Sequence, residues 1–156
     1  MQIEQIKGER SLTLKLQGAI DENADYSEIS FDGIEKVIFD FEKLVRLNST
    51  GIQKWIKFFQ SIPTDMNIVL QNCSIPVVNQ LNIFPNFISA ENLTIESFYG
   101  PYYCEECDDT YSILLNNPSD FPDQDNYSAP AKLCPKDNSD LEFDEIEKKY
   151  FLFLKR

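Results

Sequence analysis

Three of the four cysteines in this chain of 156 residues are spaced like metal ligands. Cys104 and Cys107 are separated by two residues, and Cys134 starts a second stretch of the same length that ends at Asp137. Two such turns separated by a loop form a zinc ribbon, because each two-residue spacer lets a tight turn aim two side chains at one ion. Carboxylate is an acceptable but rarer ligand in such sites. The sequence therefore predicts a degenerate zinc ribbon in which Cys104, Cys107, Cys134 and Asp137 bind zinc.

Other roles for the cysteines stay open at this stage. In a decayed site, ordinary aromatic packing would hold the C-terminal part, through Tyr102, Tyr103, Phe143, Tyr150, Phe151 and Phe153. Alternatively, a small enzyme could use the Cys104/Cys107/Cys134 cluster for thiol chemistry or with catalytic zinc. A thioredoxin-like role is disfavoured, because no clear helix follows Cys107 to lower its pKa. Cys73, outside the cluster, is expected to be a small buried hydrophobic residue.

The residue types that are missing argue against catalysis. The chain contains no histidine, which excludes Ser-His-Asp and Cys-His mechanisms and any histidine-ligated metal. It also lacks a glycine-rich phosphate loop and a nucleophile–base signature. We therefore expect a non-enzymatic protein.

A second polar motif, Asn48-Ser49-Thr50-Gly51, precedes an apolar stripe at helical spacing. The stripe comprises Ile52, Trp55, Ile56, Phe59 and Ile62, and predicts a helix over residues 50–62. Thr50 and Gln53 have the spacing of a capping box, in which each side chain bonds the backbone N–H of the other. Gly51 would let another backbone approach the first turn. Capping alone accounts for most of this composition; a binding or switching role is the alternative.

The surrounding elements alternate between strands and helices. Strands are expected near residues 3–6, 12–16, 37–41, 66–70 and 93–98, with a turn at 18–21. A second helix should start at Ser74 and bury Val77, Val78, Leu81 and Phe84. Residues 1–99 thus predict a small α/β domain, a mixed β-sheet with helices packed on it. Residues 100–156 read as a loop-rich β tail whose last stretch, 141–154, is apolar enough to dock as a strand or short helix.

The stretches Leu16–Asp21, Val37–Phe41 and Leu47–Ile52, in this order and spacing, resemble the STAS domain. This is the family of anti-sigma factor antagonists and of the cytoplasmic tails of sulfate transporters. The resemblance covers about residues 1–99. It implies a partner-binding surface at Asn48, Ser49, Thr50, Gly51 and Gln53. In regulated bacterial members a partner kinase, which is also the anti-sigma factor, phosphorylates a serine at the position of Ser49.

The sequence departs from the family pattern at Asn48, where the family has an aspartate. Asparagine keeps the capping shape and removes the charge beside the candidate serine. A helix N-terminus tolerates a phosphate because its N–H groups are unpaired, while the added charge would disrupt a close interface. The resemblance thus implies a regulatory or scaffold protein in signalling that binds another protein, with Ser49 as the position of a phosphorylation switch.

Charge and hydropathy limit the partners. The formal net charge is −12, and residues 100–156, with 13 acids and 6 bases, carry −7 of it. Such a charge repels phosphate backbones and disfavours nucleic acid as a partner. No stretch approaches the ~20 apolar residues that span a bilayer, and the first ten residues lack the apolar run of a signal peptide. We therefore expect a cytoplasmic protein that is not inserted in a membrane.

Overall fold

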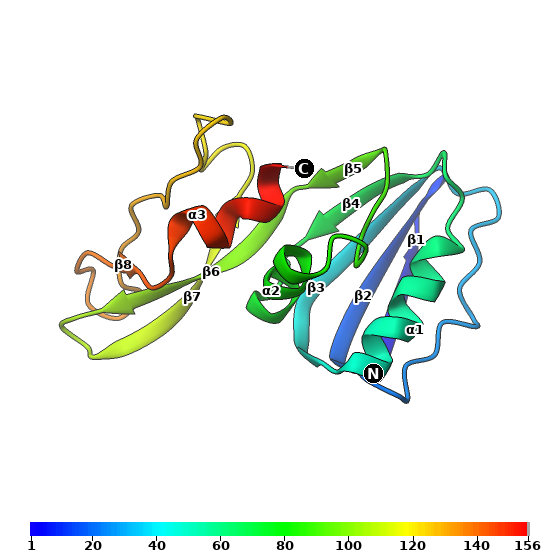
Figure 1. Ribbon diagram of the computed structural model, residues 1–156, viewed down its shortest axis with the longest axis horizontal. Coiled ribbons are helices and arrows are strands. Elements are labelled where there is room, and N and C mark those ends of the chain that lie inside the picture. The colour runs from blue at the N-terminus through cyan, green and yellow to red at the C-terminus, as the bar shows by residue number, and fades with distance from the viewer. Residues whose placement is uncertain (156) are drawn as a thin grey trace.

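A computed structural model describes residues 1–155 and shows mixed α/β architecture with two sheets (Figure 1). The larger sheet has five strands in the order β1-β2-β3-β4-β5. Their bounds are β1 Gln2–Lys7, β2 Ser11–Ile20, β3 Lys36–Leu47, β4 Asn67–Gln71 and β5 Leu93–Ile95. β1 runs antiparallel to β2, and the other neighbours are parallel. The expectation of a mixed sheet with helices is confirmed.

Two helices follow the central strands and cover one face of this sheet (Figure 1). They are α1, Ser49–Gln60, after β3, and α2, Ile75–Ile83, after β4. Trp55 of α1 packs edge-on against Phe39 and Phe41 of β3, with ring centroids 5.3 and 5.7 Å apart. Its indole N–H donates to the Phe87 carbonyl oxygen at 2.8 Å, so this large buried side chain leaves no polar atom unpaired.

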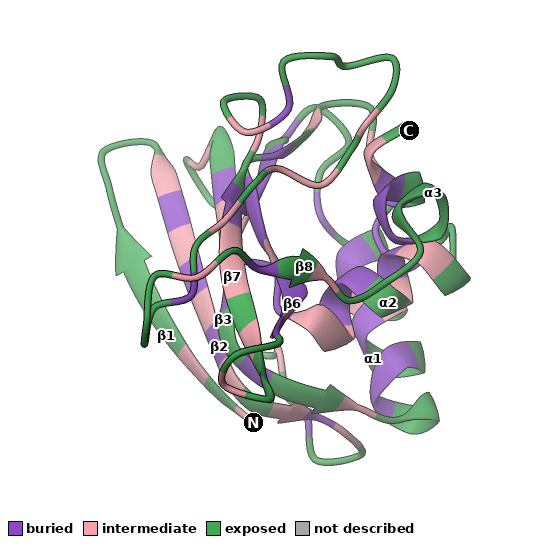
Figure 2. Ribbon diagram, turned by 90° about the vertical axis from the view of Figure 1, so that its left-hand side faces the viewer, coloured by how far each residue is buried: buried purple, intermediate pink, exposed green. Residues whose placement is uncertain are grey.

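Alternation along the strands explains which face is covered. Leu12, Leu14 and Leu16 of β2 are almost fully buried, while the residues between them are only half-buried. Figure 2 shows this alternation on β2 and the exposure of most of β1 at the edge. One face of the sheet therefore packs on the helices, and the opposite face stays more open to solvent.

The smaller sheet contains β6 Ser97–Cys104, β7 Asp109–Asn116 and β8 Glu142–Phe143, all antiparallel, in the order β7-β6-β8. The chain ends in α3, Glu147–Tyr150, and a 3-10 helix η1, Phe151–Lys155. Asn82 of α2 fixes this end, because its side chain donates to the Tyr150 carbonyl at 2.9 Å and accepts from the Phe153 N–H at 2.8 Å. The expectation that residues 141–154 dock as ordered structure is confirmed.

β6 connects the two parts of the chain. Only Glu96 separates it from β5, and the predicted boundary between residues 99 and 100 falls inside it. Phe98 is fully buried and forms a bridge with Cys73 beside the first sheet. Six strand residues later, β6 ends at Cys104. The buried hydrophobic core is accordingly one cluster that includes residues of both parts.

Several boundaries differ from the sequence-based expectation. β2 continues to Ile20 instead of turning at residue 18. The backbone of Gly18 has a φ of +90°, and the pairing of β2 with β3 shifts register there without ending the strand. The expected strand 93–98 is two strands that belong to different sheets. Phe84 is 45% exposed and not part of the buried face of α2, since the helix has already ended at Ile83.

No helix within residues 1–155 has the length and apolarity to cross a membrane.

Candidate functional site

The four predicted metal ligands lie together at the end of the smaller sheet. Cys104 ends β6, and Cys107 lies in the turn before β7. Cys134 and Asp137 lie in a turn of the long segment between β7 and β8. One ligand atom from each residue lies within 4.8 Å of all the others, although 33 residues separate Cys104 from Asp137. The structure therefore brings together all four residues that the spacing suggested.

Each turn directs a backbone N–H at the sulfur of its first cysteine. The Cys107 N–H points to the Cys104 sulfur at 3.4 Å, and the Lys136 N–H points to the Cys134 sulfur at 3.4 Å. Each turn ends in a left-handed residue, Asp108 with φ 49° and Asn138 with φ 60°. Asp and Asn tolerate this conformation better than most residues. Backbone N–H groups aimed at sulfur favour the thiolate, which is the form that binds metal.

The distances fit a tetrahedral zinc ion. With Zn–S bonds of about 2.3 Å, two sulfur ligands at a tetrahedral angle lie about 3.8 Å apart. The sulfurs of Cys107 and Cys134 are 3.7 Å apart. Asp137 Oδ2 lies 3.4 Å from the Cys107 sulfur, in keeping with a shorter Zn–O bond of about 2.1 Å. These two separations agree with a tetrahedral zinc site, and the four residues could hold a metal ion.

Ser139 orients the carboxylate ligand, a role that the sequence did not suggest. Asp137 Oδ1 accepts from the Ser139 hydroxyl at 2.6 Å and from the Ser139 backbone N–H at 3.0 Å. These hydrogen bonds hold the pKa of the Asp137 carboxyl far below its ordinary value. They occupy Oδ1 and leave Oδ2 for an ion. The signal was a serine two residues after the aspartate, the spacing of an Asx turn.

Without an ion, the thiols of the cluster differ in their pKa values. A hydrogen bond with the Ser139 hydroxyl, at 3.2 Å, lowers the pKa of Cys104. Burial and the neighbouring thiols instead raise the pKa of Cys107 to about 12. Three thiolates and a carboxylate in such a small space repel one another, so a cation is needed for all of them to ionise together. Cys104 and Cys134 are fully buried and Asp137 is exposed, so solvent reaches the cluster from the carboxylate side.

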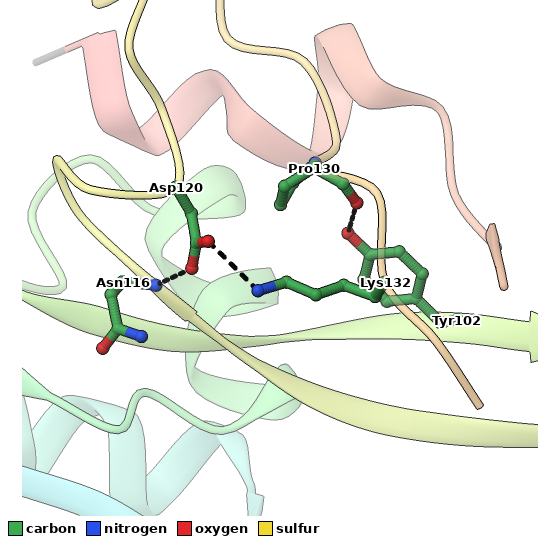
Figure 3. Close-up of polar contacts among 5 residues, drawn as sticks. All are labelled: Tyr102, Asn116, Asp120, Pro130 and Lys132. Carbon is green, nitrogen blue, oxygen red and sulfur yellow. Dashed lines mark hydrogen bonds and ion pairs between the residues drawn. The ribbon is translucent and has the colours of Figure 1, made fainter. Parts of the chain in front are cut away.

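The segment that carries the second turn is tied to β6 and β7 by polar contacts (Figure 3). The Tyr102 hydroxyl donates to the Pro130 carbonyl oxygen at 2.8 Å. The Lys132 ammonium lies 3.0 Å from Asp120 Oδ1, and Asp120 Oδ2 accepts from the Asn116 N–H at 2.8 Å. Burial alone would raise the pKa of Asp120, but these two partners hold it below its ordinary value. The segment is therefore anchored a few residues before Cys134.

The second predicted site lies at the start of α1, beside the five-stranded sheet and away from the β6–β7 turn (Figure 1). Asn48, Ser49, Thr50 and Gln53 are exposed, and Gly51 is buried. The predicted capping box of Thr50 and Gln53 is wrong. Asn48 is the N-cap instead, because its Oδ1 accepts from the Gly51 N–H at 2.8 Å, and α1 begins one residue earlier than predicted.

Gly51 has the predicted role of a close backbone contact. A Cβ atom built on it would lie 2.1 Å from the Ile20 carbonyl oxygen and 2.6 Å from the Asp21 nitrogen. The Asn48 N–H also donates to the Ile20 oxygen at 3.1 Å. The end of β2 and the start of α1 are therefore in direct contact, and only glycine fits between them.

Glu22 belongs to this site, although the sequence did not single it out. Its Oε2 accepts from the Asn48 side-chain amide at 2.8 Å. A hydrogen bond from the Glu22 backbone N–H to its own carboxylate, together with the one from Asn48, holds the pKa of Glu22 below its ordinary value. The Asn48 side-chain amide thus donates a hydrogen bond to a charged carboxylate, which an aspartate at position 48 could not do.

Replacing Asn48 with aspartate should raise the pKa of Glu22, because a donor is exchanged for a second negative charge at hydrogen-bond distance. The folded-state pKa then moves upward from its lowered value. NMR titration of the Glu22 side-chain carboxyl measures it. Asn48→Ala is the control that removes the donor without adding charge, so its effect should be smaller and in the same direction. An unchanged Glu22 pKa in Asn48→Asp would contradict the contact.

Comparisons with protein-family models, with curated proteins and with solved structures found no match for this chain.

Proposed function

We propose that the chain is a non-enzymatic regulatory or scaffold protein with a structural zinc ion in its C-terminal part. The observation that carries the zinc proposal is the convergence of three sulfurs and one carboxylate oxygen within 4.8 Å from two separate turns. When bound, zinc would supply a fixed link between these turns. Four protein ligands leave no open coordination position, which is typical of structural sites and argues against catalytic zinc.

We further propose that a protein partner binds at the start of α1. Asn48, Ser49, Thr50 and Gln53 all present exposed polar side chains there. Val45, just before them, is 66% exposed and adds an apolar contact. The arrangement of β3, this turn and α1 on the five-stranded sheet supports a STAS-like assignment for about residues 1–99. The partner would be a signalling protein, of which an anti-sigma-type kinase is one candidate.

Ser49 is the residue where this surface would be switched. Its side chain is exposed in the first turn of α1, where unpaired N–H groups and the helix dipole favour an added phosphate. The phosphate would introduce roughly −2 charges into the contact with a partner. Phosphorylation would therefore weaken binding without unfolding α1.

Ser49→Ala should keep partner binding, and Ser49→Glu should reduce it severalfold, because only the second change adds charge to the surface. The measurement is recovery of the partner in pull-downs from the cells of origin, quantified by mass spectrometry. Ser128→Glu is a matched control, since Ser128 is also exposed but lies in the segment between β7 and β8. Equal recovery with all three variants would show that Ser49 is not a switch.

A further inference from the structure

A cavity of about 650 Å³ lies between the edge strand β5 and the C-terminal part of the chain. Its walls come from β5, from the segment after α2, from the turn after β7 and from η1. The volume lies within the range of ordinary ligand pockets. It is lined by residues of both parts of the chain, and neither the metal cluster nor the start of α1 contributes to it.

The main chain of β5 offers unused hydrogen-bonding groups to this cavity. β5 pairs with β4 in a parallel register of Ile68 with Leu93 and of Leu70 with Ile95. The bonds to β4 are formed by the residues on either side, since Asn92 O accepts from Ile68 N–H and Glu96 N–H donates to Leu70 O, each at 2.9 Å. Leu93 and Ile95 therefore direct their N–H and C=O groups away from β4.

Only one of these outward groups has a partner among residues 1–155. The Asn117 amide nitrogen donates to the Ile95 carbonyl oxygen at 3.1 Å. The Leu93 N–H, the Leu93 C=O and the Ile95 N–H form no hydrogen bond within the described chain. They are spaced along one strand edge, which is the pattern that another extended chain pairs with.

Asn117, which lines the same cavity, covers the C-terminal end of the β5 edge. Its Oδ1 is shielded from solvent and has no partner within the described chain. The bond from its nitrogen to Ile95 fixes the orientation of the amide, so the oxygen cannot be exchanged for the nitrogen by a flip. A shielded acceptor without a partner costs free energy unless a donor reaches it.

The charge of the residues that line the cavity indicates which kind of peptide segment would bind there. Glu91 is the only charged residue among those described in its lining. It is exposed two residues before β5, on a protein with a net charge of −12. A segment with a lysine or arginine near Glu91 is favoured, and an acidic one is repelled.

We propose that this edge binds an extended, basic segment of another protein, which adds a strand beside β5. Main-chain groups of the segment pair with the unpaired groups of Leu93 and Ile95, and a basic side chain lies near Glu91. This surface is separate from the start of α1, so the two could be occupied together.

The test is selection of a displayed library of random nine-residue peptides on the full protein, with each enriched peptide then measured by fluorescence anisotropy. The expected result is a set of peptides rich in β-branched and basic residues. Their binding should fall more than tenfold in Leu93→Pro, which removes an outward N–H at an edge where proline is tolerated. In isotope-labelled protein, the peptide should slow amide exchange at Leu93 and Ile95.

A second variant keeps the test decisive if Leu93→Pro does not fold. Glu91→Lys alters only an exposed charge, and it should weaken basic peptides about threefold. Peptides whose lysines are changed to glutamate should regain affinity for that variant. Glu9→Lys makes the same charge change on the exposed turn between β1 and β2 and should have no effect. The proposal is overturned if no peptide is enriched, if binding is indifferent to the variants at 91 and 93, or if the Leu93 and Ile95 amides are already protected in the free protein.

Discussion

Removal of zinc is expected to lower the midpoint of thermal unfolding by about 10 °C. A ligand at 1,000 times its dissociation constant stabilises the folded state by about 4 kcal/mol, and each kcal/mol shifts the midpoint of a chain of this size by about 2–4 °C. Cys104→Ser should cause a similar loss, because it removes one of the two fully buried sulfurs of the cluster. Differential scanning calorimetry with and without a chelator measures both.

The controls separate loss of zinc from damage to the core. The chelator should have little further effect on Cys104→Ser, whereas Cys73→Ala should remain sensitive to it, because Cys73 is buried outside the cluster. Asp137→Cys should keep zinc and bind it more tightly, since thiolate is the more common structural ligand. Native mass spectrometry should find one zinc per chain that is lost on denaturation. No bound metal and no response to the chelator would refute the site.

Gly51→Ala is expected to destabilise the protein by about 2 kcal/mol. Alanine improves helix propensity by about 1 kcal/mol, but overpacking of a rigid contact typically costs 1–3 kcal/mol and can cost more. Here the new Cβ would lie 2.1 Å from the Ile20 carbonyl oxygen, and a backbone atom cannot move away as a flexible side chain can. The result is a displaced start of α1. Urea unfolding followed by tryptophan fluorescence measures the loss, since Trp55 is buried one helical turn away.

Thr50→Ala is the matched comparison for this change. Thr50 is exposed in the same helical turn, so its substitution should alter the free energy of unfolding by less than about 0.5 kcal/mol. If Gly51→Ala is as stable as Thr50→Ala, the contact between β2 and α1 is looser than described, and glycine is not required there.

Local patterns in the sequence predicted the parts of the fold and site that depend on neighbouring residues. The spacing of Cys104 and Cys107, with its repeat at Cys134 and Asp137, was sufficient to group the ligands because each pair lies in one turn. The stripe that includes Trp55 likewise predicted α1, although its capping residue was misassigned. Threonine and asparagine are both good N-caps, and the sequence alone did not decide between Thr50 and Asn48.

The features that the sequence missed depend on contacts between distant segments. Glu22 reaches Asn48 across 26 positions, and nothing local marks it. The division of residues 93–98 into two strands of different sheets also has no local signal, because Leu93–Ile95 and Ser97–Cys104 both have apolar strand character. Which strand pairs with which is decided by tertiary packing and not by propensity.

The second turn of the proposed zinc site, Cys134 to Asp137, lies in a long segment that has little regular structure of its own. After β7 ends at Asn116, only the two residues of β8 are extended until α3 begins at Glu147. An ion that joins Cys107 to Cys134 would close this part of the chain into a loop, as a disulfide does. Cross-links that close loops of roughly 30 residues reduce the conformational entropy of the unfolded chain by an amount worth about 3–4 kcal/mol. Unlike a disulfide, a bound ion is released when the chain unfolds, so the metal would stabilise the folded state through its binding free energy. It would be a reversible link that forms and is lost without oxidation of a thiol.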